Sequence, residues 1–479
     1  MFKGNSYYLV FVFALILSGC KNLELSVDPV KDEMPKRFDI TADSTSAQMT
    51  NWQTEFFDPN LIAILDSALK NNFDLQIALQ KVEIARAGIK FNKGIRLPEL
   101  STLATMGQRK FGDYTMDGVG NYDTQFSPNI SDKQQIPNPL PDYYVGFQAS
   151  WEIDLWGKLK NKKKAAASRF IASQYGKDLI ITNLVAEIAT SYFELLALDN
   201  EIQIFDDNIK IQETALELAI AKKQAGKASE LDVEMMTAQL LSSRATQSEI
   251  QQQVLEIETK LSFLCGYYPK TIVRDTSYFS RHLENKIRTG IPSDLIRNRA
   301  DIRQAEYELI AANADVKSAQ AAFYPSLTLN SALGLHAFNS ALLLESPASI
   351  AYQVLGGLSA PLLNRRKIKA DLMAGKAGQR EAYIQYEKTV VSGFREVYVA
   401  INKIKNTQAI TDLKKQEVFI LKNSISTSSE LFKAGRANYL EVLTSQKNSL
   451  MAQIELNNYY KRQNIALVEL YRAIGGGWK

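Results

Sequence analysis

Residues 225–233 decide the fold, because a closely similar segment occurs a second time in the chain. They read Ala225-Gly226-Lys227-Ala228-Ser229-Glu230-Leu231-Asp232-Val233, and residues 434–442 read Ala434-Gly435-Arg436-Ala437-Asn438-Tyr439-Leu440-Glu441-Val442, an offset of 209 residues. An earlier pair of matching segments, 74–98 and 301–325, keeps an offset of 227 residues. The two matches occur in the same order, which predicts a duplicated unit of roughly 200 residues that buries its apolar face against copies of itself.

Long helices are predicted on both sides of these turns. Residues 158–224 and 365–433 contain no proline, and apolar residues recur at heptad-like spacing, as at Ile181, Leu184 and Ile188. At 1.5 Å per residue the first stretch would span about 100 Å. We therefore expect each unit to read helix, strand, strand, long helix, turn, long helix, with long coiled-coil hairpins that end at the glycine-containing turns.

Alternating segments predict four strands. Residues 143–155 alternate apolar and polar side chains most clearly, residues 327–337 and 350–358 do so as well, and residues 99–108 do so weakly. Such strands are typical of a half-buried soluble sheet and of a transmembrane barrel. About eight strands are the fewest that close a barrel, so lipid-facing strands would require several copies of the chain. The strand spacing leaves a dimer and a trimer open, and the intervening loops, about 109–141 and 338–349, are expected outside the cell.

The N-terminus predicts a lipid anchor. Lys3 precedes an apolar run over residues 7–17, and Leu17-Ser18-Gly19-Cys20 resembles a bacterial lipobox. We expect a signal peptide over residues 1–19, cleavage before Cys20, diacylation of its sulfur with fatty acid such as palmitate, and a lipid-anchored extension over residues 20–57. An ordinary signal peptide with a chance cysteine is the alternative.

Composition excludes several classes of function. The net charge of +4, on 56 basic and 52 acidic residues, is too balanced for a nucleic-acid binder. Histidine occurs only at His282 and His336, and the sequence has no paired-cysteine motif and no glycine-rich phosphate loop, so we expect no enzyme, no metal site and no cofactor. After the signal peptide no run of 18 consecutive apolar residues occurs, so no spanning helix is predicted.

Basic clusters occur where a strand gives way to a long helix. They are Lys158, Lys160, Lys162, Lys163 and Lys164, and then Arg365, Arg366, Lys367 and Lys369. Cations at a helix start oppose its macrodipole, so helix stability does not account for them. Two explanations remain: phospholipid head groups of a membrane's inner leaflet as partners, and a merely solvated face.

Several motifs resemble the TolC-like outer membrane factors, in particular the NodT-type lipoprotein branch. The sharpest are residues 151–158, 290–306 and 322–329, and the resemblance runs over about residues 60–475. The family usually has proline where this chain has Ala300. The resemblance implies an α+β membrane protein with two structural repeats per chain. It implies a homotrimer whose 12-stranded transmembrane β-barrel continues as a 12-helix coiled-coil α-barrel in the periplasm.

The resemblance also implies a function. It is that of the outer membrane channel of a tripartite efflux system, a passive duct for drugs and other toxic small molecules. A periplasmic adaptor (membrane fusion) protein would connect the channel to an inner-membrane pump of the resistance-nodulation-division (RND) type. The first efflux repeat would cover residues 58–266 and the second residues 292–475. Residues 267–291 would form an equatorial connector, to which the sequence assigns no role.

Site residues carry over from the resemblance at the two turns. Adaptor contacts would be made by Ala225, Gly226, Lys227, Ala434, Gly435 and Arg436. Asp232 and Glu441, six residues beyond each turn glycine, would form the channel gate, where up to six carboxylates around a three-fold axis favour bound cations. The alternative is that both acids merely stabilise the first turn of a helix.

Two other functions fit the same pattern. The outer channel of a type I protein secretion system would use the same fold, and a lipid-anchored periplasmic coiled-coil scaffold would need no pore. The clean alternation of residues 143–155 argues against the scaffold. The exported cargo is not indicated by the sequence.

Overall fold

The computed structural model describes residue 35 and residues 58–279, 298–361 and 365–476. The chain divides into two compact units, residues 1–35 and 36–479, and the description below concerns the second. The predicted signal peptide, Cys20 and all of the N-terminal extension except residue 35 lie outside the described residues, as do residues 280–291 of the connector.

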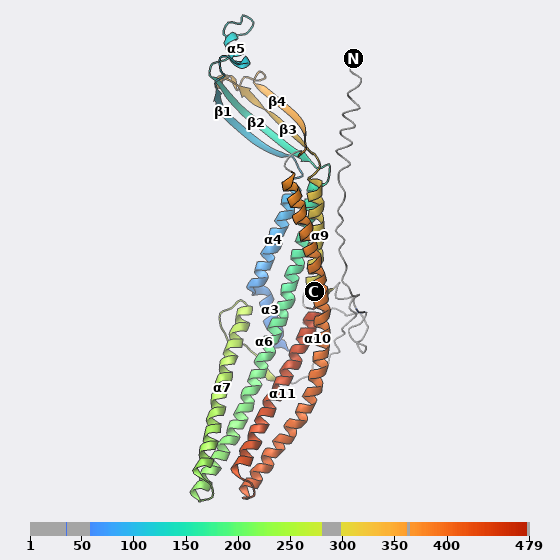
Figure 1. The fold of residues 1–479 in the computed structure, drawn as a ribbon. Coiled ribbons are helices and arrows are strands. Elements are labelled where there is room, and N and C mark those ends of the chain that lie inside the picture. The colour runs from blue at the N-terminus through green and yellow to red at the C-terminus, as the bar shows by residue number, and fades with distance from the viewer. Residues whose placement is uncertain (1–34, 36–57, 280–297, 362–364, 477–479) are drawn as a thin grey trace. The chain divides into compact units, whose positions relative to one another are not determined.

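The elements repeat in the predicted order (Figure 1). The first repeat contains α3 (Pro59–Asn71), α4 (Phe73–Gly94), β1 (Glu99–Arg109), α5 (Met116–Asp123), η1 (Asp132–Gln134), β2 (Leu140–Ile153), α6 (Lys158–Gln224) and α7 (Glu230–Leu264). After η2 (Thr276–Tyr278), the second contains α9 (Ala300–Ala321), β3 (Ser326–Ala337), η3 (Ser340–Leu342), β4 (Ile350–Ser359), α10 (Arg366–Lys433) and α11 (Tyr439–Ala473). Equivalent helices match in length: α4 and α9 have 22 residues each, and α7 and α11 have 35 each. The predicted α+β fold with two repeats is confirmed.

The long helices lie side by side in the order α7, α6, α11 and α10 (Figure 1). Each neighbouring pair is antiparallel, because a tight turn joins α6 to α7 and another joins α10 to α11. The upper half of α6 packs against α4 and α9 instead, and the upper half of α10 packs against α9 (Figure 1). Two helices of this layer, α7 and α10, therefore lie at its edges.

The four strands form one antiparallel sheet in the order β1-β2-β3-β4. Its register aligns apolar side chains across β2, β3 and β4, as in the row Val145, Leu335 and Ile350 and the row Phe147, Leu333 and Tyr352. The opposite face is polar: the Ser150 hydroxyl donates to Asn330 Oδ1 at 2.8 Å, and Glu152 is the cross-strand neighbour of Thr328. The predicted alternation of β2 thus extends over the sheet, which has one apolar face and one polar face.

The strand predicted over 143–155 is displaced toward the N-terminus and ends at Ile153. Asp154 turns instead to the start of α6, where its carboxylate accepts the N–H groups of Leu159 at 3.0 Å and Lys160 at 2.6 Å. Leu155, predicted to lie on the apolar strand face, therefore falls outside the strand and is exposed. Local capping chemistry ends the strand before its apolar alternation does.

The loop predicted over 109–141 holds a short helix, α5, and the 3₁₀ turn η1. Thr115 caps α5, because its hydroxyl accepts the Gly118 N–H at 3.1 Å. The helix has only eight residues, two of them glycine, so it shows no apolar periodicity that a sequence pattern could reveal. A salt bridge of 2.8 Å between Lys133 and Glu345 ties this loop to the loop between β3 and β4.

The main core surrounds the middle of α6. Tyr192, Ile188 and Leu195 are fully buried there against Leu61 and Leu65 of α3, and α7 and α11 add further apolar side chains. The Tyr192 hydroxyl donates to Asp58 Oδ2 at 2.5 Å, and Asp58 also caps α3. Burial, together with this carboxylate, raises the pKa of Tyr192. The phenol therefore stays protonated and holds the start of the described chain against α6.

Within the described residues, α6 is long and apolar enough to cross a membrane by length and composition, which the run of consecutive apolar residues did not predict. Its most apolar 18-residue window has a mean hydropathy of 1.4, but 61% of that window is buried inside the fold. A buried core helix passes the same test. We therefore regard this stretch as the centre of the helical core.

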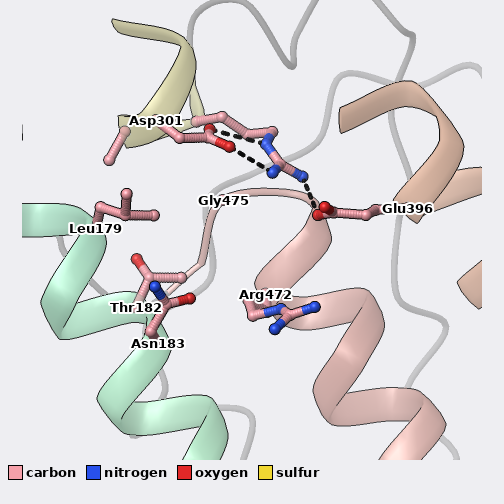
Figure 2. Close-up of a pocket in the computed structure, with 9 residues that line it drawn as sticks. Leu179, Thr182, Asn183, Asp301, Glu396, Arg472 and Gly475 are labelled. Atoms are coloured by element: carbon pink, nitrogen blue, oxygen red, sulfur yellow. Dashed lines mark hydrogen bonds and ion pairs between the residues drawn. The ribbon is translucent and has the colours of Figure 1, made fainter. Parts of the chain in front are cut away.

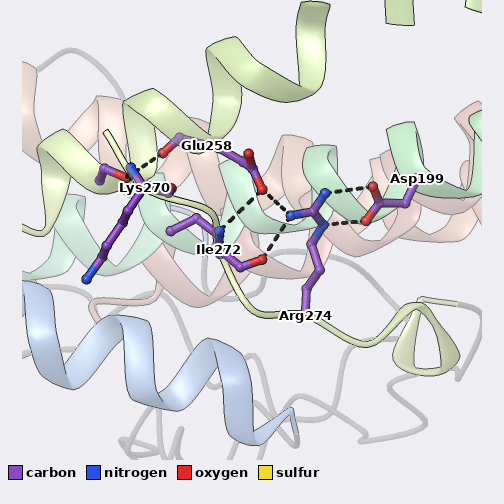
Figure 3. Close-up of polar contacts among 6 residues, drawn as sticks. Asp199, Glu258, Lys270, Ile272 and Arg274 are labelled. Atoms are coloured by element: carbon purple, nitrogen blue, oxygen red, sulfur yellow. Dashed lines mark hydrogen bonds and ion pairs between the residues drawn. The ribbon is translucent and has the colours of Figure 1, made fainter. Parts of the chain in front are cut away.

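The connector after α7 has a role that the sequence did not reveal (Figure 3). Arg274 donates from Nε and Nη2 to the Asp199 carboxylate of α6, at 2.5 and 2.9 Å, and from Nη1 to Glu258 of α7. The hydrogen bonds that Arg274 donates to Asp199 and Glu258 outweigh burial and raise the pKa of Arg274. This bridge fixes the middle of α6 to the C-terminal part of α7, at the end of the hairpin away from its turn.

Replacing Arg274 with Met should destabilise the fold, because it leaves two poorly solvated carboxylates without a cation. We expect a loss of about 3 kcal/mol, measured as a lower thermal unfolding midpoint in detergent. Arg244→Met is the matched control, since Arg244 pairs with Glu213 where both side chains are exposed, 54% and 42%. The control should cost less than about 1 kcal/mol, and equal losses in the two variants would contradict the assignment.

Candidate functional site: the two hairpin tips

The first tip joins α6 to α7 through a tight turn with two hydrogen bonds that end the helix. The Gly226 N–H donates to Lys223 O at 2.9 Å, and the Lys227 N–H donates to Lys222 O at 2.8 Å. This paired pattern is the Schellman motif, which needs a left-handed residue at its centre. Gly226 supplies it with φ of 71°.

The second tip joins α10 to α11 in the same way. The Gly435 N–H donates to Phe432 O at 3.1 Å, the Arg436 N–H donates to Leu431 O at 2.9 Å, and φ of Gly435 is 72°. The six residues predicted to contact an adaptor, Ala225, Gly226, Lys227, Ala434, Gly435 and Arg436, are all exposed at these tips. The backbone hydrogen bonds and φ angles are sufficient to identify these six residues as turn residues.

The two predicted gate acids occupy equivalent positions but different surroundings. Asp232, half-buried, completes a capping box: its carboxylate accepts the Ser229 N–H at 2.8 Å, and its own N–H donates to the Ser229 hydroxyl at 3.2 Å. Glu441 is exposed, and only its backbone N–H takes part in capping, donating to Asn438 Oδ1 at 3.0 Å. The capping alternative therefore describes Asp232 in this structure and does not describe the Glu441 carboxylate.

A contact between the tips was missed by the sequence analysis. Lys222 Nζ donates to Phe432 O at 2.6 Å and lies 3.5 Å from the centroid of the Phe432 ring, which is buried. A desolvated ammonium over an aromatic face is attracted by the ring quadrupole. This clasp joins the first hairpin to the second. One sequence signal could have indicated this contact. Lys222 precedes Gly226, and Phe432 precedes Gly435, by about one helical turn, so the two residues occupy nearly equivalent positions in the two repeats.

Exposed leucines accompany the acids. Leu231 is 57% exposed and Leu440 is 53% exposed, and they are equivalent residues in the two repeats. Each precedes its acid by one position and is the second residue of its helix, so each tip presents a large apolar side chain beside a carboxylate. More than half of each leucine side chain lies at the surface, where a partner can reach it.

A cavity of about 210 Å³ lies in the helical region, lined by residues of α6, α9, α10 and α11 (Figure 2). Its centre is Arg299, which donates to both oxygens of Asp301 at 3.0 and 2.6 Å, to Glu396 at 2.9 Å and to Ala473 O at 2.8 Å. Burial opposes the positive charge, but these carboxylates outweigh it and raise the pKa of Arg299. Arg299 is thereby committed to joining α9, α10 and α11, so the cavity marks a structural anchor.

Comparison with known proteins agrees with this geometry. A family model described as outer membrane efflux protein matches residues 64–267 and 291–476. The chain belongs to the outer membrane efflux protein family.

Similar proteins cover nearly the whole chain. It is 27% identical over 428 residues to the pyoverdine export outer membrane protein OpmQ of Pseudomonas putida, spanning 89% of this chain and 88% of that protein. It is 25% identical to the probable outer membrane lipoprotein SilC of Salmonella typhimurium, over 100% of both. The solved structure of the outer-membrane channel OprN matches with a TM-score of 0.83 at 22% identity, over 94% of this chain and 99% of that one, which shows the shared fold.

For this member of the outer membrane efflux protein family, the resemblance found in the sequence and the localisation to the outer membrane are confirmed. The family consists of transport channels. Within the described residues no group of three or more histidine, cysteine, aspartate or glutamate side chains could hold a metal ion. The roles of Asp232, Glu441 and the turn residues stay predictions, as does the lipidation of Cys20.

Replacing Gly435 with Ala should loosen the second tip, because a left-handed conformation costs an alanine about 1 kcal/mol. Faster hydrogen exchange of the amides around residues 431–441 would report the loss. Gly378→Ala on α10 is the control: a Cβ there meets nothing within 4 Å, and Gly378 is helical, so this variant should be stabilised by about 1 kcal/mol. Unchanged exchange in Gly435→Ala would contradict the turn assignment.

Proposed function

We propose that the chain is the outer membrane channel of a tripartite efflux system, a passive duct that opens on the periplasmic side at the hairpin tips. One observation carries the proposal: a sheet with a continuous apolar face and two open edges continues into paired helical hairpins. The family and its named relatives, which include an export protein for pyoverdine, support efflux of small molecules over the export of proteins.

Assembly follows from the edges of the sheet. The outer edges of β1 and β4 have no partner strand in the described chain. Backbone N–H and C=O groups cannot stay unpaired in lipid, so β1 of one copy would pair with β4 of the next. Two copies give eight strands and three give twelve, and we propose the homotrimer implied by the family resemblance. The same operation would close the helical layer, because α7 and α10 lie at its edges.

The scaffold alternative is weakened by the surface of the sheet. On its apolar face Phe147, Val145 and Tyr352 are 54%, 48% and 81% exposed. A water-soluble scaffold would leave these side chains in contact with water at a cost of about 25 cal/mol for each Å² of apolar surface. A lipid environment removes that cost.

We also propose the remaining partners. The exposed tips, with Leu231 and Leu440 beside their acids, would meet a periplasmic adaptor, which would connect the channel to an inner-membrane pump of the RND type. Diacylated Cys20 would anchor the N-terminus in the outer membrane, as the lipoprotein name of the relative SilC supports. The cargo would be set by the pump, because a wide duct binds its cargo weakly.

Crosslinking tests the assembly. Single cysteines at the outer edges of β1 and β4, for example Thr102→Cys with Val354→Cys in a Cys265→Ser background, should yield a covalent trimer in membranes under oxidation. Residues directly opposite each other on antiparallel strands have Cα atoms about 4.5–5.5 Å apart, a distance that a disulfide can span. Because the register between copies is not known, a short scan of β4 positions accompanies the pair. A species that stays monomeric throughout the scan would overturn the proposal.

The gate is tested by removing charge without removing the cap. Asp232→Asn keeps a side-chain oxygen that accepts the Ser229 N–H, and Glu441→Gln keeps the length of its side chain. Together they should lower the preference of the pore for cations over anions in planar bilayers, because a ring of carboxylates concentrates cations. Replacing both acids with alanine should in addition admit a bulky antibiotic through the outer membrane.

Glu230→Gln with Glu430→Gln is the matched control. Both acids lie near the tips, and each pairs with a lysine of its own hairpin, Lys223 or Lys433. The control should leave ion selectivity nearly unchanged. Equal changes in control and gate variants would show a general charge effect and contradict the assignment of Asp232 and Glu441.

A further inference from the structure

A dense group of cations lies where the long helices leave the sheet. The first two turns of α6 carry Lys160, Lys162, Lys163 and Lys164, and the start of α10 carries Arg365, Arg366, Lys367 and Lys369. We call these eight residues the basic belt. All are exposed except Lys163, which is half-buried.

The fold does not neutralise the belt. In the part of the chain that the structure describes, none of the four α6 lysines, and none of Arg366, Lys367 and Lys369, forms an ion pair. Two acids near the start of α6 are already engaged: Glu152 pairs with Lys158 at 2.5 Å, and Asp154 accepts two backbone N–H groups. Asp371 on α10 is the nearest acid in the sequence to Lys367 and Lys369, so one carboxylate stands against the eight cations of the belt. The positive charge is therefore free to meet an external anion.

Helix stability gives no reason for these cations. The N-terminal ends of α6 and α10 carry the positive pole of the helix dipole, which repels cations. Gly157 and Arg365 precede the two helices without any side-chain capping bond of their own. The same energetically poor arrangement occurs at the start of both long helices, in both repeats, which points to an external partner.

The position of the belt matches a membrane surface. The strands end at Ile153 and Ser359, and the belt begins within seven residues of each end. At 1.5 Å per residue, Lys164 lies about 9 Å along α6 from its first residue. If the strands cross the hydrocarbon core, this distance is close to the thickness of one head-group layer, about 5–8 Å.

An aromatic pair at the same level gives a second, independent indication. Trp156 stacks on Tyr324 with ring centroids 4.9 Å apart, and its Nε1 donates to Pro325 O at 2.7 Å. The two rings remain 49% and 41% exposed. They come from the turn after β2 and from the turn before β3. Tryptophan and tyrosine in such positions are typical of the membrane–water interface.

We propose that the basic belt binds the phosphates of anionic phospholipids in the leaflet that faces the periplasm. The contacts fix the height of the channel in the membrane, with the Trp156–Tyr324 pair at the boundary of the hydrocarbon. Lysine and arginine suit this partner, because phosphate oxygens accept charge-assisted hydrogen bonds. This inference rests on the proposed function, since it needs the strands to lie in the membrane.

The test replaces Lys160, Lys162, Lys163 and Lys164 with Gln in the full-length protein. Wild type and variant are reconstituted in nanodiscs of equal parts phosphatidylglycerol and phosphatidylcholine, and retained lipids are counted by native mass spectrometry. Wild type should retain phosphatidylglycerol in preference to phosphatidylcholine. The variant should lose at least about fivefold of that preference, the contribution of a single cation near an anionic surface. Raising the salt concentration should weaken the preference of the wild type.

The control neutralises four exposed lysines that lie away from the belt: Lys81, Lys210, Lys422 and Lys447. It should retain phosphatidylglycerol as the wild type does. Equal lipid preference in wild type and belt variant would overturn the proposal, as would wild-type binding to purified peptidoglycan that the belt variant alone loses while its lipids stay unchanged.

Conductance in planar bilayers separates this inference from the proposed function. Wild-type protein that conducts without preferring phosphatidylglycerol defeats only the lipid proposal. Wild-type protein that neither enters bilayers nor conducts defeats the proposed channel, and with it the reason for placing the belt at a membrane.

Discussion

The structure depends on a single unsatisfied requirement, the hydrogen bonding of two strand edges. A sheet of four strands leaves one row of backbone groups unpaired on β1 and another on β4. In water such edges can be solvated, but in lipid each unpaired group costs several kcal/mol. The apolar face built by β2, β3 and β4 makes water a poor environment for this sheet. The two conditions are met together only when copies of the chain join edge to edge, so one chain supplies only part of the proposed assembly, a third of it in a trimer.

The helices inherit their arrangement from the same requirement. Each hairpin of strands feeds directly into a long helix, from β2 to α6 and from β4 to α10. Copies joined through strands must therefore also bring α7 of one copy toward α10 of the next. The polar contacts within one chain join different pairs of helices. Arg274 joins α6 to α7, Arg299 joins α9 to α10, and Lys222 joins the two tips. These three contacts hold the helices of one chain together along the length between the sheet and the tips.

The sequence predicted the repeat, the bounds of the long helices and the tip turns, because glycine and proline act through local backbone geometry. Gly226 ends α6 wherever the rest of the chain lies. It could not predict features that depend on partners far along the chain. Arg274 pairs with Asp199, which is 75 residues away in the sequence, and Lys222 contacts Phe432, which is 210 residues away. Asp154 was misplaced for another reason: it continues a strand pattern while its carboxylate caps a helix, and the cap prevailed.

The two repeated turns place their acids, Asp232 and Glu441, in different surroundings. In the first repeat the cap is Ser229, whose hydroxyl accepts one N–H, and Asp232 must satisfy the N–H of Ser229 itself. In the second repeat the cap is Asn438, and the Glu441 side chain is longer and exposed. A carboxylate that accepts a hydrogen bond from a nearby backbone N–H extends less far from its helix than an unbound one. It also binds a cation less readily, because that hydrogen bond must first break. If the two acids form the gate, we expect Asp232 to act as a fixed charge at the wall and Glu441 to be the acid that can follow a passing cation toward the axis.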